Sequence, residues 1–363
     1  VFETAIVYLK YGRIGRFRAR PFRPRSVILI PTHRCNAHCL MCGIWKEKSA
    51  IDEEITPEQY RVILNDPLFR KLEFVGINGG ESVLRKDLIE LADISLSCCP
   101  SMKRLSLVTN GILTERLKST VPRLADLAQS RGVLLDVSVS VHGLGSVLNE
   151  IYGVEDASVR IRETLDFLKT LRDQNRLSIS MNAVLLKSNL HQARELFKWA
   201  SEMDLDVRFV IGEQRERFRN EECGNHFLGP EDRGELIEFL NEMKNSFSLR
   251  NPSSLRYREL VAMFRDGKTR SLPCAYEMGG VLIGYDGSLY YCSHSRPIGN
   301  CLEKSASEIF YDPKNLKYRR EALRKKECRQ CPPYTLTRWE LQADILRVFR
   351  HLLSSRISGF FRN

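Results

Sequence analysis

The sequence predicts an α/β fold in which a parallel sheet closes fully or partly into a barrel and a small α+β domain follows. Between residues 26 and 212, strand-like apolar runs alternate six times with amphipathic helical segments. This alternation is typical of parallel βα units. Residues 271–334 are instead rich in Cys, Gly, Pro and Tyr. That composition has too few apolar side chains to form a core alone, so a bound metal is a plausible support.

Each expected strand is a short apolar run that ends at a turn or a polar residue. The strands are expected at residues 26–30, 72–77, 105–109, 134–141, 177–185 and 207–211. The helices between them are expected at residues 56–64, 87–97, 113–130, 159–174 and 191–203. Thr56 caps the first helix and Pro57 occupies its first position, where a missing N–H costs nothing.

The regular alternation ends after residue 212. Residues 213–226 are charged and expected to form a loop, two helices are expected at 231–244 and 255–266, and a Tyr-Asp-Gly turn at 285–287 predicts a hairpin. We divide the chain into a basic N-terminal arm (1–25), a barrel (26–212), a helical linker (213–270), a small cysteine-rich domain (271–335) and a basic amphipathic C-terminal helix (336–363).

Composition excludes several classes of protein. With 43% hydrophobic and 28% charged residues, the chain is neither wholly disordered nor fibrous, and no apolar run approaches the roughly 18 residues that span a bilayer. The net charge of +11 gathers at the two ends. The near-neutral body makes nucleic acid an unlikely partner. The basic ends favour contact with an anionic membrane surface or a phosphorylated substrate. A solvated N-terminal arm and a C-terminal helix packed on the barrel explain the basic residues equally well.

Eleven cysteines and no export signal predict a cytoplasmic protein, with peripheral membrane contact as a lesser alternative. Cys35, Cys39 and Cys42 directly follow the first strand, where barrel active sites lie. Three thiolates on one loop cannot complete a four-coordinate zinc site, but they can hold three irons of a cubane cluster. The alternative is a zinc loop completed by His33 or His38.

The loop Pro-Thr-His-Arg-Cys-Asn-Ala-His-Cys-Leu-Met-Cys at 31–42 resembles that of the radical S-adenosylmethionine (SAM) enzymes. Gly-Gly-Glu at 79–81, Thr-Asn-Gly at 109–111 and Ser-Val-His-Gly at 140–143 also resemble family positions. Met41 replaces the usual aromatic residue and Ser82 replaces the usual proline. The resemblance covers residues 26–212 and implies a partial (β/α)6 TIM-type barrel.

The resemblance implies that Cys35, Cys39 and Cys42 bind a four-iron cluster whose open iron is chelated by SAM. The cofactor-binding residues that it implies are Gly79, Gly80, Glu81, Asn110, Ser140 and Asn182. The diglycine and the acid are expected beside the methionine end of SAM, Ser140 at its ribose and Asn182 near its carboxylate. Polar residues at strand ends are also common structural caps. Tyr152-Gly153 occupies the place of a usual family arginine, for which Arg160 or Arg162 is a substitute.

Cys274, Cys292, Cys328 and Cys331 form a second set, separated around the expected hairpin. The arrangement resembles the twitch domain, the shorter relative of the SPASM domain, and implies one auxiliary four-iron cluster. Structural zinc fits the same spacing. If one of these thiolates is not a ligand, a substrate binds the free iron. Cys301 is either a further ligand or a buried thiol.

The implied activity is reductive cleavage of SAM to a 5′-deoxyadenosyl radical, which abstracts a hydrogen atom from a small substrate. We expect an oxidoreductase, lyase or epimerase that dehydrogenates, epimerises or dehydrates a sugar or cyclitol. The auxiliary cluster assists electron transfer, and flavodoxin or ferredoxin is the electron donor.

Two other functions stay open. A maturase of ribosomally made peptides ranks second, because only about 25 residues precede the first strand. A non-enzymatic binding protein stabilised by a cluster or zinc ranks third. Catalytic candidates near the last strand and the hairpin are Arg208, Glu213 and Tyr290, although ordinary surface polarity explains each equally well.

Overall fold

The computed structural model describes residues 23–46, 53–174, 176–247, 252–272 and 274–332. It divides into two compact units. The first comprises Pro24–Gly229 and Val281–Phe310, and the described part of the second comes from Pro230–Gly280 and from Tyr311 onward. Almost all of the basic arm and the whole expected C-terminal helix lie outside the described residues. Within the described residues, no helix has the length and apolarity needed to cross a bilayer.

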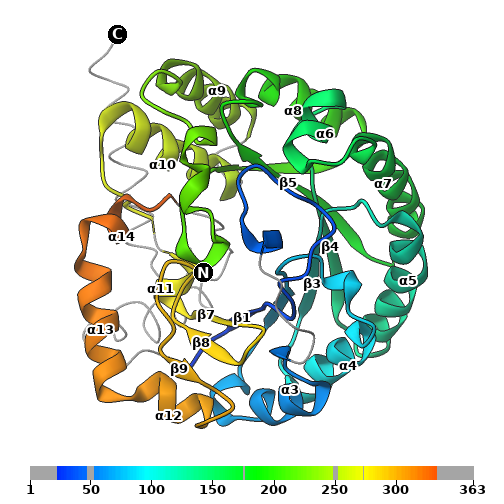
Figure 1. The fold of residues 1–363 in the computed structure, drawn as a ribbon, viewed down its shortest axis with the longest axis vertical. Coiled ribbons are helices and arrows are strands. Elements are labelled where there is room, and N and C mark those ends of the chain that lie inside the picture. The colour runs from blue at the N-terminus through cyan, green and yellow to red at the C-terminus, as the bar shows by residue number, and fades with distance from the viewer. Residues whose placement is uncertain (1–22, 47–52, 175, 248–251, 273, 333–363) are drawn as a thin grey trace, which may run out of the picture. The chain divides into compact units, whose positions relative to one another are not determined.

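Six parallel strands form the centre of the first unit (Figure 1). Each pairs with the next strand along the chain, and β1 also neighbours β7. The strands are β1 (Ser26–Leu29), β2 (Phe74–Ile77), β3 (Arg104–Thr109), β4 (Leu134–Ser140), β5 (Ser178–Leu185) and β6 (Asp206–Ile211). The sheet is open, with β6 at one edge and β9 at the other. The partial barrel expected from the sequence is therefore confirmed.

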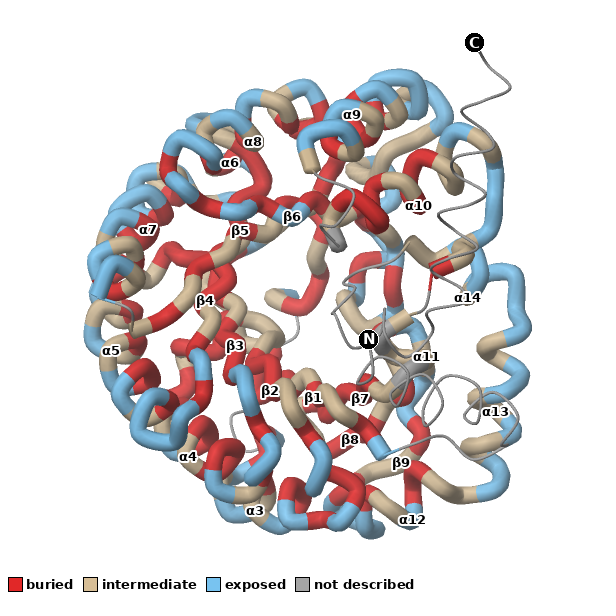
Figure 2. Tube along the Cα trace, turned by 180° about the vertical axis from the view of Figure 1, so that it is seen from behind, coloured by how far each residue is buried: buried red, intermediate tan, exposed pale blue. Residues whose placement is uncertain are grey.

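Helices cover the outer face of this sheet (Figure 1). They are α3 (Pro57–Leu64), α4 (Leu88–Cys98), α5 (Thr114–Ser130), α6 (Gly145–Tyr152), α7 (Ala157–Asp173) and α8 (Ala193–Glu202). Along β5, fully buried residues alternate with partly exposed ones. Val137 and Val139 of β4 and Leu165 of α7 have no exposed surface. Burial of apolar side chains on both sides of the helix–sheet interface stabilises this layer. In Figure 2 the exposed residues lie mainly on the outer helices, and the strands inside are buried or intermediate.

The expected hairpin forms and continues the same sheet. It consists of β7 (Gly280–Ile283) and β8 (Ser288–Tyr290), which pair antiparallel, and β9 (Gly299–Asn300) pairs with β8. Gly287 in the turn has φ +86°, a conformation that side chains with a Cβ disfavour. The backbone N–H of Ile30 donates to the carbonyl of Ile283 at 2.9 Å, which ties the hairpin to the segment after β1.

Helix α6 was not predicted from the sequence. It has no side-chain cap at its N-terminus, and it ends at Gly153 in the left-handed conformation with φ +61°. In the sequence, the Tyr-Gly pair at 152–153 indicates this helix end, because a glycine in the left-handed conformation ends many helices. The charged segment at 213–226 is a loop with two short 3₁₀ turns at Glu216–Phe218 and Glu221–His226.

The second unit is helical where it is described. Its helices are α9 (Arg233–Ser246), α10 (Pro252–Asp266), α11 (Ala275–Met278), α13 (Pro313–Arg324) and α14 (Lys326–Gln330), while α12 (Ala306–Tyr311) begins in the first unit. Phe239 and Leu240 of α9 and Leu260 of α10 are buried. The two helices expected after residue 230 are therefore present.

A matched pair of buried tyrosines gives a test of this fold. Each has 1% of its surface exposed, but the Tyr60 hydroxyl has no partner among the described residues, whereas the Tyr152 hydroxyl donates to the Ser140 carbonyl at 2.6 Å. A buried polar group without a hydrogen bond costs free energy. We expect Tyr60→Phe to raise the free energy of unfolding by about 1 kcal/mol and Tyr152→Phe to lower it by about the same amount. Urea unfolding of the two variants checks this, and equal losses for both would contradict it.

Candidate metal centre

The three cysteines of the first set lie on one loop after β1. The N–H of Cys42 donates to the carbonyl of Cys39 at 3.0 Å, which curls the loop into a turn. The loop is anchored to the end of α6, since the N–H groups of His38 and Leu40 donate to backbone carbonyls there at 2.8 and 2.9 Å. All three cysteines are partly exposed. The fold therefore presents three thiols together at the carboxyl end of the sheet.

Backbone pairing joins this loop to the Gly-Gly-Glu segment after β2. The N–H of Gly80 donates to the Thr32 carbonyl at 2.9 Å, and the N–H of Glu81 donates to the Arg34 carbonyl at 2.7 Å. A Cβ on Gly80 would overlap the Arg34 carbonyl oxygen. Gly79 has φ +140°, which favours glycine. The two glycines thus allow the two backbones to approach, while their expected place beside the methionine end of SAM stays a prediction.

The side chain of Glu81 joins the ends of β2 and β3. Its side chain has no exposed surface and accepts from the Thr109 hydroxyl at 3.0 Å and the Asn110 N–H at 2.7 Å. Burial raises the pKa of this carboxyl to about 7, against the hydrogen bonds that lower it. The Asn110 amide donates to the Cys35 sulfur at 3.8 Å and to Asn36 Oδ1 at 2.9 Å. Glu81 and Asn110 are therefore part of the loop's support, and their contacts with SAM stay predictions.

A second polar network holds the beginning of the loop. Glu54 accepts from the Thr32 hydroxyl and, at 2.9 Å, from Arg34 Nε. The buried Arg85 donates to the Pro31 carbonyl at 2.8 Å and to the Ile55 carbonyl at 3.0 Å. The sequence does not predict this network, because no local pattern links residues so far apart along the chain.

The three thiols are poorly placed to ionise without a positive partner. Burial raises the pKa of Cys35 to about 11, and it also raises the pKa values of Cys39 and Cys42. Metal ligation requires thiolates, and a buried thiolate needs a compensating positive charge. A metal held by all three sulfurs provides that charge, so the donor set fits the cluster that the resemblance implies. His33 and His38, the ligands of the zinc alternative, instead pack their rings against Tyr285 and Trp45.

The loop after β6 packs on the cysteine loop. The N–H of Gly43 donates to the Phe218 carbonyl at 2.8 Å, and the Asn220 amide donates to the Met41 carbonyl at 2.9 Å. Burial raises the pKa of Cys42, and the positive charge of Arg217 is close enough to oppose that rise. The sequence predicts only a charged loop for these residues, although a loop at the carboxyl end of the last barrel strand is a usual place for functional side chains.

Ser140, Asn182 and Arg208 form a row across three neighbouring strands. The register pairs Ser140 with Asn182, and Asn182 with Arg208. The Asn182 amide donates to the Ser138 hydroxyl of β4. Their proximity agrees with a shared ligand, but their roles toward SAM or substrate stay predictions. The two substitute arginines, Arg160 and Arg162, instead pair with acidic residues one helical turn away on the exposed surface of α7.

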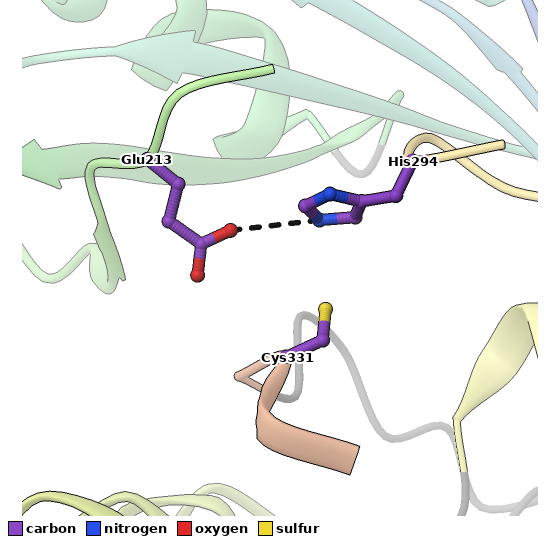
Figure 3. Close-up of side chains that lie close together, drawn as sticks. All are labelled: Glu213, His294 and Cys331. Atoms are coloured by element: carbon purple, nitrogen blue, oxygen red, sulfur yellow. Dashed lines mark ion pairs between the residues drawn. The ribbon is translucent and has the colours of Figure 1, made fainter. Parts of the chain in front are cut away.

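Glu213 lies beside His294, a residue that no sequence motif marks. Its carboxylate accepts from Arg215 Nη2 at 2.8 Å and lies 3.5 Å from His294 Nε2 (Figure 3). Arg215 is buried and also donates to the Ser293 hydroxyl at 3.0 Å. Burial raises the pKa of Tyr290, which also feels the charge of Asp286. Arg215 thus holds Glu213 in place, while the catalytic role of Glu213 stays a prediction.

The second cysteine set divides between the units. Cys274, Cys328 and Cys331 belong to the second unit and Cys292 to the first. All three cysteines of the second unit are close enough to Arg270 for their charges to raise its pKa. Cys301 is buried in the first unit, near the charges of Asp66 and Asp286, as the buried-thiol alternative expected.

The contact at Gly80 gives a test of the cysteine loop. In Gly80→Ala the new methyl group meets backbone, so the loop must shift. We expect a loss of about 1–3 kcal/mol in the free energy of unfolding, as for other overpacked sites, and less iron per chain after anaerobic reconstitution. The control is Gly234→Ala in α9, whose Cβ meets nothing within 4 Å. An unchanged iron content in Gly80→Ala, equal to that of the control, would contradict the proposed support.

His142, which follows β4, gives a pH test. Its Nδ1 accepts from the Val184 N–H at 3.1 Å, and burial lowers its pKa to about 4 from an ordinary 6.5. Between these values the unfolded chain binds a proton that the folded chain does not, so stability falls as the pH falls. We expect a loss of about 2 kcal/mol from pH 7 to pH 5. Urea titrations at both pH values measure it, and His142→Asn, which keeps an acceptor, should lack that part of the slope. An identical slope in both proteins would exclude His142 as the source.

Two family models match the chain. The model described as the radical SAM superfamily matches residues 29–200, and the model described as the SPASM iron–sulfur cluster-binding domain matches residues 274–332. The first match contains the loop with Cys35, Cys39 and Cys42, and the second contains all four cysteines of the second set.

Curated relatives include a PqqA peptide cyclase of Bradyrhizobium diazoefficiens, 29% identical over 188 residues, with 50% of this chain and 45% of that protein covered. A GTP 3′,8-cyclase of Aquifex aeolicus is 25% identical over 316 residues, with 81% of this chain and 91% of that protein covered. The chain spans about half the length of the first curated relatives that it matches.

Solved structures share the fold. Streptococcus suis SuiB bound to S-adenosylmethionine has a TM-score of 0.60 at 15% identity, with 88% of this chain and 74% of that chain covered. Native anSMEcpe with bound AdoMet has a TM-score of 0.57 at 17% identity, with 92% and 98% covered. The paired family matches, the three-thiol loop and the open parallel sheet agree with one another. The chain contains a radical SAM domain and a C-terminal SPASM iron–sulfur cluster-binding domain. These domains imply SAM and two iron–sulfur clusters as its cofactors.

Proposed function

We propose that this radical SAM enzyme modifies a peptide. The observation that carries the proposal is the sequence match to PqqA peptide cyclases, at 29% identity over 188 residues in one species and 27% over 188 residues in Rhodopseudomonas palustris. This match covers half of this chain. It favours the peptide maturase over the sugar or cyclitol enzyme that the sequence analysis ranked first.

Structures of the same fold with peptides support the proposal. They include SuiB bound to the precursor peptide SuiA, with a TM-score of 0.61, and anSMEcpe with a bound Cp18Cys peptide, with a TM-score of 0.57. At 17% and 18% identity these structures speak for the fold alone. They make a peptide compatible with this architecture, so the size of the substrate is no objection.

The inner face of the sheet has the chemistry that a peptide needs. Closed barrels usually fill this space with branched aliphatic side chains. Here Asp136 of β4 accepts from Ser106 of β3 at 3.2 Å and from Ser178 of β5 at 2.7 Å, and Ser180 donates to Ser138 at 3.1 Å. Several of these residues, Asp136 among them, are partly exposed. Such a face offers donors and acceptors to the N–H and C=O groups of a peptide backbone.

The chain's own residues would bind and position this substrate. Cys35, Cys39 and Cys42 would hold the cluster which, with SAM, supplies a hydrogen-abstracting radical. Glu213 is the proposed proton acceptor, because Arg215 holds its carboxylate on the loop that packs against the cysteines. Arg208 and Tyr290 stay proposed substrate contacts, and flavodoxin or ferredoxin stays the proposed electron donor.

A second candidate substrate is GTP. The match to the Aquifex aeolicus GTP 3′,8-cyclase covers 91% of that protein. The match to the PqqA peptide cyclase of Bradyrhizobium diazoefficiens covers 45% of that protein. A nucleotide is polar too, so the inner face of the sheet does not distinguish the two substrates. The product of the reaction distinguishes them.

The test is an anaerobic assay of the reconstituted enzyme with dithionite and SAM. The substrates are a set of short synthetic peptides that together present every side chain and, in a parallel arm, GTP. We expect a peptide to raise 5′-deoxyadenosine formation at least tenfold over the uncoupled rate and to lose two hydrogen atoms by mass spectrometry. The control, with Cys35, Cys39 and Cys42 all changed to Ala, should be inactive. Consumption of GTP with no response to any peptide would reject the peptide and promote the cyclase.

A further inference from the structure

Arg270 is a buried cation in the second unit, between α10 and the first cysteine of the second set. Its side chain is 6% exposed. A guanidinium is charged at any physiological pH and is costly to bury without partners. Its position therefore requires a local source of negative charge.

Hydrogen bonds fix the side chain against one cysteine. Arg270 Nη2 donates to the Cys328 sulfur at 3.9 Å, within reach for sulfur, and to the Cys328 carbonyl at 3.3 Å. Nη1 donates to the Leu272 carbonyl at 2.8 Å. The backbone N–H of Arg270 donates to the Arg329 carbonyl at 2.7 Å, which joins the two cysteine-bearing segments of this unit. Nε is buried and has no partner among the described residues.

Three thiols and one carboxyl group are the acidic groups that act on Arg270. Burial alone would lower its pKa, but the charges of Cys274, Glu277, Cys328 and Cys331 raise it. Glu277 lies 3.9 Å from Nη1, at the limit of an ion pair. A thiol becomes a full negative charge when it binds a metal. The arginine is thus placed for the metal-bound state of the cysteines.

We propose that Arg270 is a positioning residue of the auxiliary cluster, holding the Cys328 sulfur and setting the reduction potential of the cluster by its buried charge. This inference goes beyond the proposed function, because it holds whatever the substrate is. Hydrogen bonds to ligand sulfurs and nearby charge are known determinants of cluster potentials. Reduction adds one negative charge to the cluster. A buried cation favours that form, so Arg270 raises the potential.

The experiment uses the full chain with both clusters reconstituted and titrates each cluster potentiometrically by electron paramagnetic resonance. In Arg270→Gln we expect the equilibrium constant for reduction of the auxiliary cluster to fall at least tenfold, which is a shift of about 59 mV to lower potential for a one-electron couple. The SAM-binding cluster serves as an internal reference and should keep its potential. The control is Arg320→Gln, an exposed arginine on α13, which should shift neither cluster.

Arg270→Lys separates charge from geometry. Lysine keeps the charge but lacks the planar fork that reaches both the sulfur and the carbonyl, so we expect a smaller shift in the same direction. If Arg270→Gln retains too little iron to titrate, the lysine variant decides. An unchanged auxiliary potential in either variant with normal iron content would overturn the proposal. Zinc in place of iron at the second set of the wild-type protein would overturn it as well.

Discussion

Backbone pairing between the cysteine loop and the Gly-Gly-Glu segment is the constraint on which the site depends. Two N–H groups after β2 donate to the carbonyls of Thr32 and Arg34, directly before the first cysteine. The pairing needs backbone without a Cβ at Gly80. It fixes the loop before any metal binds. The entropic cost of ordering three ligands therefore falls on folding and not on metal binding. The position of the thiols therefore follows from how β1 and β2 end.

Buried polar residues extend this constraint into the sheet. Glu81 links the ends of β2 and β3, and Asn110 carries the link to Cys35. On the other side of the loop, Glu54 and Arg85 hold residues 31–34. In a low-dielectric interior such hydrogen bonds are strong when every member is paired, and a lost partner is costly. These networks make the loop a rigid part of the barrel, as a site that handles a reactive species requires.

The second cysteine set also has a buried polar residue beside it, Arg270. The first set is held mainly through hydrogen bonds to its loop, whereas Arg270 donates from a charged group directly to the Cys328 sulfur. If Cys328 binds a metal as a thiolate, this buried cation compensates its negative charge. The full ligand set of the second site stays a prediction.

The sequence by itself determined the alternation of strands and helices, the two cysteine sets and the family, because periodicity and ligand spacing are local properties of a chain. It placed β1–β6 and the hairpin, but it missed α6, which has no N-terminal capping signal. Only the tertiary structure decided which polar residues surround the thiols. The supporting residues lie far along the chain from the cysteines that they support, and no sequence motif marks them. They are Glu54, Arg85, Arg217 and Arg270. Their roles arise from charge and burial in three dimensions, which a linear pattern does not encode.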